Sequence, residues 1–157
     1  AQTGHLVLAT LHTNDAPQSL TRLENMGIPT YNIASSVHLV MAQRLVRKLC
    51  VACKKPEKVP EAALLEAGFT AEDLPGLQPM GPVGCEQCNG GYRGRMGLYQ
   101  VMPISEAMRE VILRGGSAMD LSRQAAAEGI LSMRQSGLLR VKEGITSLEE
   151  VLRVTNL

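Results

Sequence analysis

The four cysteines of this chain stand in two pairs with two residues between the members of each, Cys50 with Cys53 and Cys85 with Cys88. Two intervening residues let both thiolates of a turn reach one ion, so two such turns supply the four sulfurs of a tetrahedral Zn²⁺ site. The 31 residues between the pairs, 54–84, exceed the ~15–20 residues of a compact zinc ribbon. We therefore expect all four cysteines to bind zinc and the long insert to carry structure of its own.

Other uses of the cysteines are a redox-active dithiol, two disulfides or thiols without a ligand. We find no signal-peptide pattern and no apolar run near the ~20 residues of a membrane span. The cytoplasm is therefore the expected compartment, where zinc thiolates are more common than disulfides.

The composition of the chain limits the classes of partner that we expect. The chain has 157 residues and a net charge of +1, so no overall field draws it to nucleic acid or to a membrane. Aromatic residues are scarce, with one Phe, three Tyr and no Trp, so the core must rest on aliphatic side chains and methionine. Because the first residue is Ala and the opening residues read as the middle of a fold, we expect a piece of a longer protein.

The first apolar run, residues 5–10, is typical of a strand buried on both faces in a parallel α/β sheet. It is followed by His12, Thr13 and Asn14, at the strand end where such sheets bind ligands. The same residues also suit a plain strand-to-helix turn in which Asn14 or Asp15 caps the helix. The two interpretations are compatible.

Apolar spacing and capping residues predict the other elements. We expect helices over residues 16–26, 31–49 and 60–67, a strand over 97–102, and helices that start at Ser105, at Ser117, near Leu131 and at Ser147. Ser117 with Asp120 and Ser147 with Glu150 have the spacing of capping boxes.

Several motifs match one family. The first fourteen residues, AQTGHLVLATLHTN, resemble the histidine box of the secretion and pilus-assembly ATPases. The run QRLVR at residues 43–47, the two cysteine pairs, the run GYRGR at 91–95 and the run SLEEV at 147–151 look like the same family and stand in the same order. The resemblance covers nearly the whole chain.

This resemblance implies an α/β fold: the C-terminal part of a RecA-like P-loop ATPase core, with a tetracysteine zinc insert and a C-terminal helical subdomain. It divides the chain into residues 1–49, the end of the ATPase core; 50–96, the zinc-binding subdomain; and 97–157, the mainly helical subdomain. The full-length protein is then a homo-hexamer that binds ATP and Mg²⁺ and powers type IV pilus assembly through an inner-membrane platform protein. Regulatory adaptor proteins are further expected partners, nucleic acid is not, and the expected location is the cytoplasmic side of the inner membrane.

Two branches of the family compete, the pilus-assembly ATPases and the type II secretion ATPases. Three residues separate Cys88 from Tyr92, whereas many members, including the secretion branch, are expected to have four. The short turn and the C-terminal run TSLEEVLRVT look more like the pilus branch. A retraction ATPase is not expected, because those proteins lack the tetracysteine site.

The chain departs from the family at the phosphate-binding loop. It contains no Gly-x-x-x-x-Gly-Lys-Ser/Thr sequence, whose backbone N–H groups and lysine cradle the phosphates, and the segment with the Walker B acidic residues is missing too. We expect this chain alone neither to bind ATP tightly nor to hydrolyse it.

The resemblance makes His12 and His5 candidate catalytic residues. Seven strand positions of ~3.3 Å put them about 23 Å apart, so both cannot touch one phosphate, and His12 is the better candidate. Arg44 is a candidate nucleotide or inter-subunit contact, with a purely structural helix-end role as the alternative. Arg93 and Arg95 share that ambiguity, and cations near the cysteines could also offset the charge of a zinc tetrathiolate. Four protein ligands leave zinc no open position, so the metal is expected to be structural.

Two functions of other classes stay open. A zinc-ribbon-like module that binds nucleic acid or protein would need a basic stripe with stacking aromatics, and it predicts strongly salt-dependent DNA binding. A dithiol oxidoreductase predicts disulfides and no metal.

Overall fold

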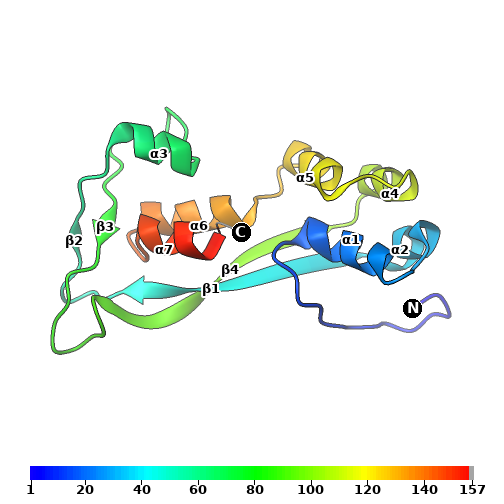
Figure 1. Ribbon diagram of the computed structural model, residues 1–157, viewed down its shortest axis with the longest axis horizontal. Coiled ribbons are helices and arrows are strands. Elements are labelled where there is room, and N and C mark those ends of the chain that lie inside the picture. Colours follow the sequence, from blue (N-terminus) through cyan, green and yellow to red (C-terminus); the bar gives the residue numbers. More distant parts are fainter. Residues whose placement is uncertain (156–157) are drawn as a thin grey trace. The chain divides into compact units, whose positions relative to one another are not determined.

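The computed structural model describes residues 1–155, and the chain folds as two compact units (Figure 1). Unit 1 comprises Ala1–Gln43 with Tyr99–Ser132, and unit 2 comprises Arg44–Leu98 with the residues from Met133 onward. Both units are mixed α/β, in line with the expected fold class. Among residues 1–155, no helix is long and apolar enough to cross a membrane.

Helix α1 (Ala16–Asn25) confirms the first predicted helix. The Asp15 side chain accepts the backbone N–H of Gln18 at 2.8 Å and so caps the helix start, and Pro17 stands in the first turn. The chain leaves the helix through Gly27, whose φ of +87° is readily adopted only by glycine.

The remaining helices of unit 1 pack on α1 and on one another. Helix α2 contacts α1 and α4, and α5 contacts α1 and α4. Ser105 caps α4 by accepting the N–H of Met108 at 3.0 Å, and Ser117 with Asp120 forms the predicted capping box of α5. The helix bounds are Thr30–Ser36 for α2, Glu106–Leu113 for α4 and Ala118–Ala127 for α5.

The predicted helix over 31–49 is wrong beyond its first turns. After α2 the chain forms strand β1 (Leu39–Leu49), which pairs with β4 (Tyr92–Pro103). Ala42 and Val46 are buried, while Met41 and Leu45 between and beside them are exposed, so burial follows the two-residue period of a strand. The spacing of the apolar residues also fits a helix. The segment is a strand because it forms hydrogen bonds with β4, which starts more than forty residues later in the sequence.

The predicted strand over residues 5–10 is not formed. Leu6 and Leu8 are 88% and 89% exposed, and no strand of the described residues pairs with this segment. A strand is stabilised by hydrogen bonds to its neighbours, so this run, which has no pairing partner among residues 1–155, stays extended and irregular.

Unit 2 holds the insert and the last two helices. Strands β2 (Lys55–Pro56) and β3 (Met80–Gly81) form a short antiparallel pair at the base of the insert, and α3 (Glu61–Ala67) confirms its predicted helix. Helices α6 (Met133–Lys142) and α7 (Leu148–Thr155) contact each other. The core that joins the insert to these helices consists of Leu64, Ala67, Phe69, Leu138, Val141, Leu148 and Val151.

Gly137, a poor helix former in the middle of α6, is explained by this packing. A Cβ built on it would lie 2.5 Å from Cγ1 of Val151 and 3.2 Å from Cδ1 of Leu98. The glycine therefore lets α7 approach α6 more closely than any side chain would permit.

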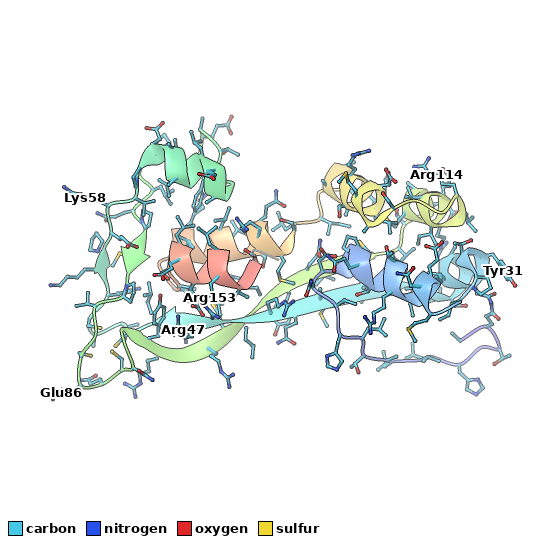
Figure 2. The ribbon with its side chains drawn as sticks, in the orientation of Figure 1. Tyr31, Arg47, Lys58, Glu86, Arg114 and Arg153 are labelled. Atoms are coloured by element: carbon cyan, nitrogen blue, oxygen red, sulfur yellow. The ribbon has the colours of Figure 1, made fainter. Side chains whose placement is uncertain are left out.

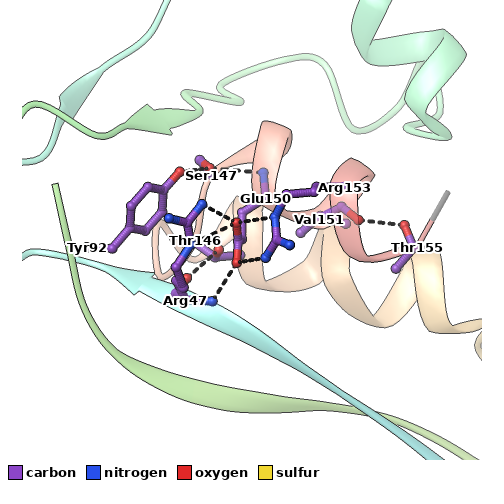
Figure 3. A network of polar contacts seen from close by, with 8 residues as sticks. All are labelled: Arg47, Tyr92, Thr146, Ser147, Glu150, Val151, Arg153 and Thr155. Atoms are coloured by element: carbon purple, nitrogen blue, oxygen red, sulfur yellow. Dashed lines mark hydrogen bonds and ion pairs between the residues drawn. The ribbon is translucent and has the colours of Figure 1, made fainter. Parts of the chain in front are cut away.

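A buried carboxylate, Glu150 of α7, ties this helix to β1 (Figure 3). The Arg47 side chain donates to Glu150 Oε2 from Nε at 3.1 Å and from Nη2 at 2.7 Å, and its backbone N–H donates to Oε1 at 2.9 Å. Arg153 adds bonds of 3.0 and 2.7 Å from the same helix. Burial raises the pKa of Glu150, but the hydrogen bonds from Arg153 and Arg47 lower it to about 2.

This geometry predicts the pH dependence of stability. Because the pKa of Glu150 is about 2 in the folded chain and an ordinary 4.5 when unfolded, its stabilisation is present above pH 4.5 and is lost as the pH falls toward 2. We expect Glu150→Gln to lower the free energy of unfolding at pH 7 by about 2 kcal/mol and to flatten its fall with acid.

Urea denaturation of wild type and variant at matched pH values between pH 7 and pH 3 measures this effect as the difference between their free energies of unfolding, because protonation of groups that both chains share cancels in that difference. The control is Glu149→Gln, which removes the same charge from the exposed neighbour. A Glu150→Gln variant as stable as wild type, with the same pH slope, would show that the two arginines do not stabilise the fold through this carboxylate.

Candidate functional site

The four cysteine sulfurs gather at one point of unit 2, all within 4.8 Å of one another. The Sγ atoms of Cys50 and Cys85 are 3.9 Å apart, and those of Cys53 and Cys88 are 3.8 Å apart. Four sulfurs at the usual Zn–S distance of about 2.3 Å in a tetrahedron lie about 3.8 Å from each other. The spacing therefore fits one zinc ion at the centre of the cluster.

Local backbone structure brings the two cysteine turns together. Cys50 follows the last residue of β1, is buried, and donates its N–H to the carbonyl of Gly91 at 2.8 Å. Gly91 lies against Pro82, and a Cβ at this position would be 2.5 Å from the proline Cβ. A side chain at position 91 would therefore clash with Pro82, and glycine lets the segment after the second cysteine pair approach Pro82 while it bonds to Cys50.

Backbone N–H groups point at the sulfurs. The N–H of Cys85 donates to Sγ of Cys88 at 3.2 Å, and that of Gly84 donates to Sγ of Cys53 at 3.4 Å. Burial raises the pKa of the Cys88 thiol, but the hydrogen bonds that its sulfur accepts, led by that of Cys85, outweigh this effect and bring the pKa to about 7, against an ordinary 9.0. The pKa of the neighbouring Cys85 thiol is raised instead to about 11, because the N–H of Gln87 lowers it less than the contacts with the other three sulfurs and burial raise it. Without metal, the thiolate is therefore favoured at Cys88 and disfavoured at Cys85.

The cluster lies at the surface on the side of the second pair. Cys85 is exposed, and Glu86, which follows it, points to solvent (Figure 2). Thiolate ligands select zinc over hard cations such as Mg²⁺, and four of them leave no position for a reactive water. The chemistry that this donor set supports is structural metal binding.

His12, Thr13 and Asn14 meet helix α1 at a second place, in unit 1. Together with Gln18 and Arg22 they line a hollow of about 420 Å³. An exposed imidazole, a hydroxyl, amides and a guanidinium can all donate hydrogen bonds to an anion. This is the region that the sequence singled out, now extended by the side chains of α1.

Gln18 and Arg22 were not predicted as site residues. They stand four residues apart on α1, and this spacing places both on one face of a helix that begins at the histidine segment. This spacing could be read from the sequence. It did not identify Gln18 and Arg22 as site residues, because the sequence does not show which face of the helix lies toward His12.

The other predicted residues lie elsewhere. His5 is exposed, its Nδ1 is 3.4 Å from Oγ1 of Thr3, and it does not line the hollow of His12. Arg44 is half-buried within β1, so its predicted place at a helix end is wrong. Arg95 lines a different hollow, in unit 2, whereas Arg93 is exposed on the same strand.

Comparison with known proteins gives consistent matches. A family model described as Type II/IV secretion system protein matches residues 1–153. The chain is 52% identical over 158 residues to the type IV pilus assembly ATPase PilB of Acinetobacter baylyi, covering 99% of this chain and 27% of that protein. It is 50% identical over 155 residues to PilB of Pseudomonas aeruginosa (99% and 27%) and 46% identical over 154 residues to type II secretion system protein E of Aeromonas hydrophila (98% and 30%). The chain thus spans less than a third of the length of these relatives.

The cysteine geometry predicts the effect of removing one ligand. Cys85→Ser replaces an exposed thiolate by a hydroxyl, a far weaker zinc ligand, so we expect the metal content to fall well below one zinc per chain. Amide hydrogen exchange should rise in residues 50–96 and stay unchanged in α1 and α2.

Metal analysis and exchange mass spectrometry check both parts. Ser117→Ala, which removes a helix cap in unit 1, is a control for general destabilisation. Zinc retained at wild-type stoichiometry in Cys85→Ser would contradict the four-cysteine ligand set.

Proposed function

This chain belongs to the type II/IV secretion system protein family, and from that premise we propose that it is the C-terminal part of a motor ATPase that powers type IV pilus assembly by ATP hydrolysis. The observation that carries the proposal is the match over nearly the full chain to pilus assembly ATPases. These two identities, 52% and 50%, exceed the 46% of the type II secretion protein E, whereas two other pilus assembly ATPases, at 42% and 40%, fall below it. The three-residue turn between Cys88 and Tyr92 favours the pilus branch.

In the proposed protein, ATP and Mg²⁺ bind mainly to the phosphate-binding loop of a RecA-like core that this chain completes. ATP hydrolysis places growing charge on the phosphate oxygens, and positioned hydrogen-bond donors stabilise it. The hollow of His12 offers such donors, and His12 is the residue that we propose to face the terminal phosphate. His5 is proposed to make a packing or inter-subunit contact. Arg44 is proposed to contact the nucleotide or a neighbouring subunit.

We propose that the zinc ion has a structural role. When bound, it links the end of β1 to the turn before β4 and closes the insert between them. Arg47 and Glu150 strengthen the same unit from the side of α7. The metal therefore takes no part in hydrolysis, and chelation should loosen unit 2 before it affects nucleotide chemistry.

The full-length protein is proposed to form a homo-hexamer on the cytoplasmic side of the inner membrane. Its proposed partners are an inner-membrane platform protein and regulatory adaptor proteins. The 157-residue chain alone is proposed to be inactive, because it lacks the phosphate-binding loop. The second candidate is the type II secretion ATPase, favoured by the 46% identity to protein E.

The role of His12 is tested in the full-length protein. We expect His12→Ala to lower the ATP turnover number about 100-fold, within the range typical of removing one hydrogen-bond donor to developing charge. Zinc content should not change, because the residue lies in unit 1 and the cysteines in unit 2.

The matched control is His38→Ala, which removes an exposed imidazole away from the hollow. Steady-state ATPase assays of both variants decide between the roles. Equal turnover in His12→Ala and wild type would remove the proposed phosphate contact, and a loss in both histidine variants would indicate general destabilisation instead.

A further inference from the structure

A second hollow, in unit 2, is not used by the proposed ATPase chemistry. Its volume is about 360 Å³, and it lies where β4 begins, beside the turn that follows the second cysteine pair. Its lining combines two guanidinium groups, an amide and backbone without side chains. The residues are Arg47, Asn89, Gly90, Tyr92, Gly94 and Arg95.

Arg47 is held in one orientation before any ligand arrives. Its Nε and Nη2 donate to buried Glu150, and its guanidinium carbon lies 4.1 Å from the centre of the Tyr92 ring. The ring is fixed in turn by a 2.7 Å hydrogen bond between the Tyr92 hydroxyl and Ser147 (Figure 3). Guanidinium has five N–H donors, so the edge formed by Nη1 and Nη2 still has donors to offer, and 48% of the side chain is exposed.

The glycines of this hollow let a ligand approach the main chain. Asn89 and Tyr92 exchange backbone hydrogen bonds of 3.0 and 3.1 Å across a two-residue turn, in which Gly90 and Gly91 have φ of +57° and +87°. Gly94 also has a positive φ, and a Cβ on either Gly90 or Gly94 would meet open space. Positive φ explains the glycines, and the missing side chains leave backbone accessible beside the two arginines.

Charge on the wall of this hollow favours an anion. Glu150 is the buried carboxylate between Arg47 and Arg153, and its single negative charge is shared by two positive ones. Exposed Arg95 adds another positive charge on the wall of the hollow, while exposed Glu149 lies close enough to Arg47 to offset part of it. The sum over these five groups is +1 at neutral pH, and a zinc tetrathiolate at the neighbouring cysteines adds −2. The positive charge is therefore local to the wall of the hollow, and recognition of an anion there rests on the arginine forks and not on a regional field.

We propose that this hollow binds a phosphate-type oxyanion, held by the open edge of Arg47 and by Arg95. Guanidinium forks match the paired oxygens of phosphate, and a fork that is already oriented loses little entropy on binding. A free diphosphate and the phosphates of a nucleotide present the same chemistry. No residue lines both this hollow and that of His12, so the proposal does not depend on the proposed ATPase role.

The competing explanation is that these arginines only offset the negative charge of the zinc thiolates. A matched pair of variants separates the two. Arg95→Ala removes a charge from the wall of the hollow, whereas Arg93→Ala removes the same charge from an exposed arginine two positions away on β4 that does not line it. A diffuse electrostatic effect would respond equally to both changes.

The experiment titrates the zinc-loaded 157-residue chain with pyrophosphate at low salt, by calorimetry and by amide chemical shifts. We expect shifts at Gly90 and Gly94, with affinity at least about fivefold weaker in Arg95→Ala and within about twofold of wild type in Arg93→Ala. Zinc content and thermal midpoint of both variants confirm that they fold.

The second probe is ATP without Mg²⁺. It is titrated into the His12→Ala variant, so that the hollow of His12 does not contribute to the binding measured. Binding of ATP tighter than that of pyrophosphate would mark a nucleotide site, and equal binding would mark a site for the oxyanion alone. Absence of pyrophosphate binding at low salt, or equal weakening by Arg93→Ala and Arg95→Ala, would overturn the proposal.

Discussion

The convergence of four sulfurs on one point is the constraint on which unit 2 depends. Two cysteine turns separated by 31 residues of insert meet with sulfur spacings that fit one tetrahedral ion. Their meeting determines where β1 ends and where β4 begins, and it closes the insert into a loop. Closing a loop of this length by chance is entropically costly, so a metal bound only by the folded arrangement stabilises it directly.

Glu150 makes a second stabilising contact in unit 2. This residue takes part both in the start of a helix and in the packing of that helix on a strand. Its backbone N–H is capped by Ser147 at 3.2 Å, which starts α7, while its carboxylate binds Arg47 of β1 and Arg153. The same contact orients Arg47 over Tyr92, at the wall of the hollow that we assign to an oxyanion. A stabilising interaction thereby also prepares a binding surface.

Local signals allowed the helices and the cysteine cluster to be predicted from sequence. The helices that follow Asp15, Ser105 and Ser117 begin where their caps predicted, because a cap is a contact between residues three positions apart. Sequence did not predict β1, because the choice between helix and strand over residues 39–49 depends on pairing with β4, far along the chain. The partners of Arg47 were missed for the same reason, since Glu150 lies 103 residues away.

X-ray absorption at the zinc edge of the purified wild-type chain tests the central claim, that one zinc ion held by four thiolates organises unit 2. We predict about one zinc per chain, surrounded by four sulfur atoms at about 2.3 Å with no nitrogen or oxygen neighbour. A coordination shell with mixed ligands, or a well-folded chain that contains no zinc, would contradict it.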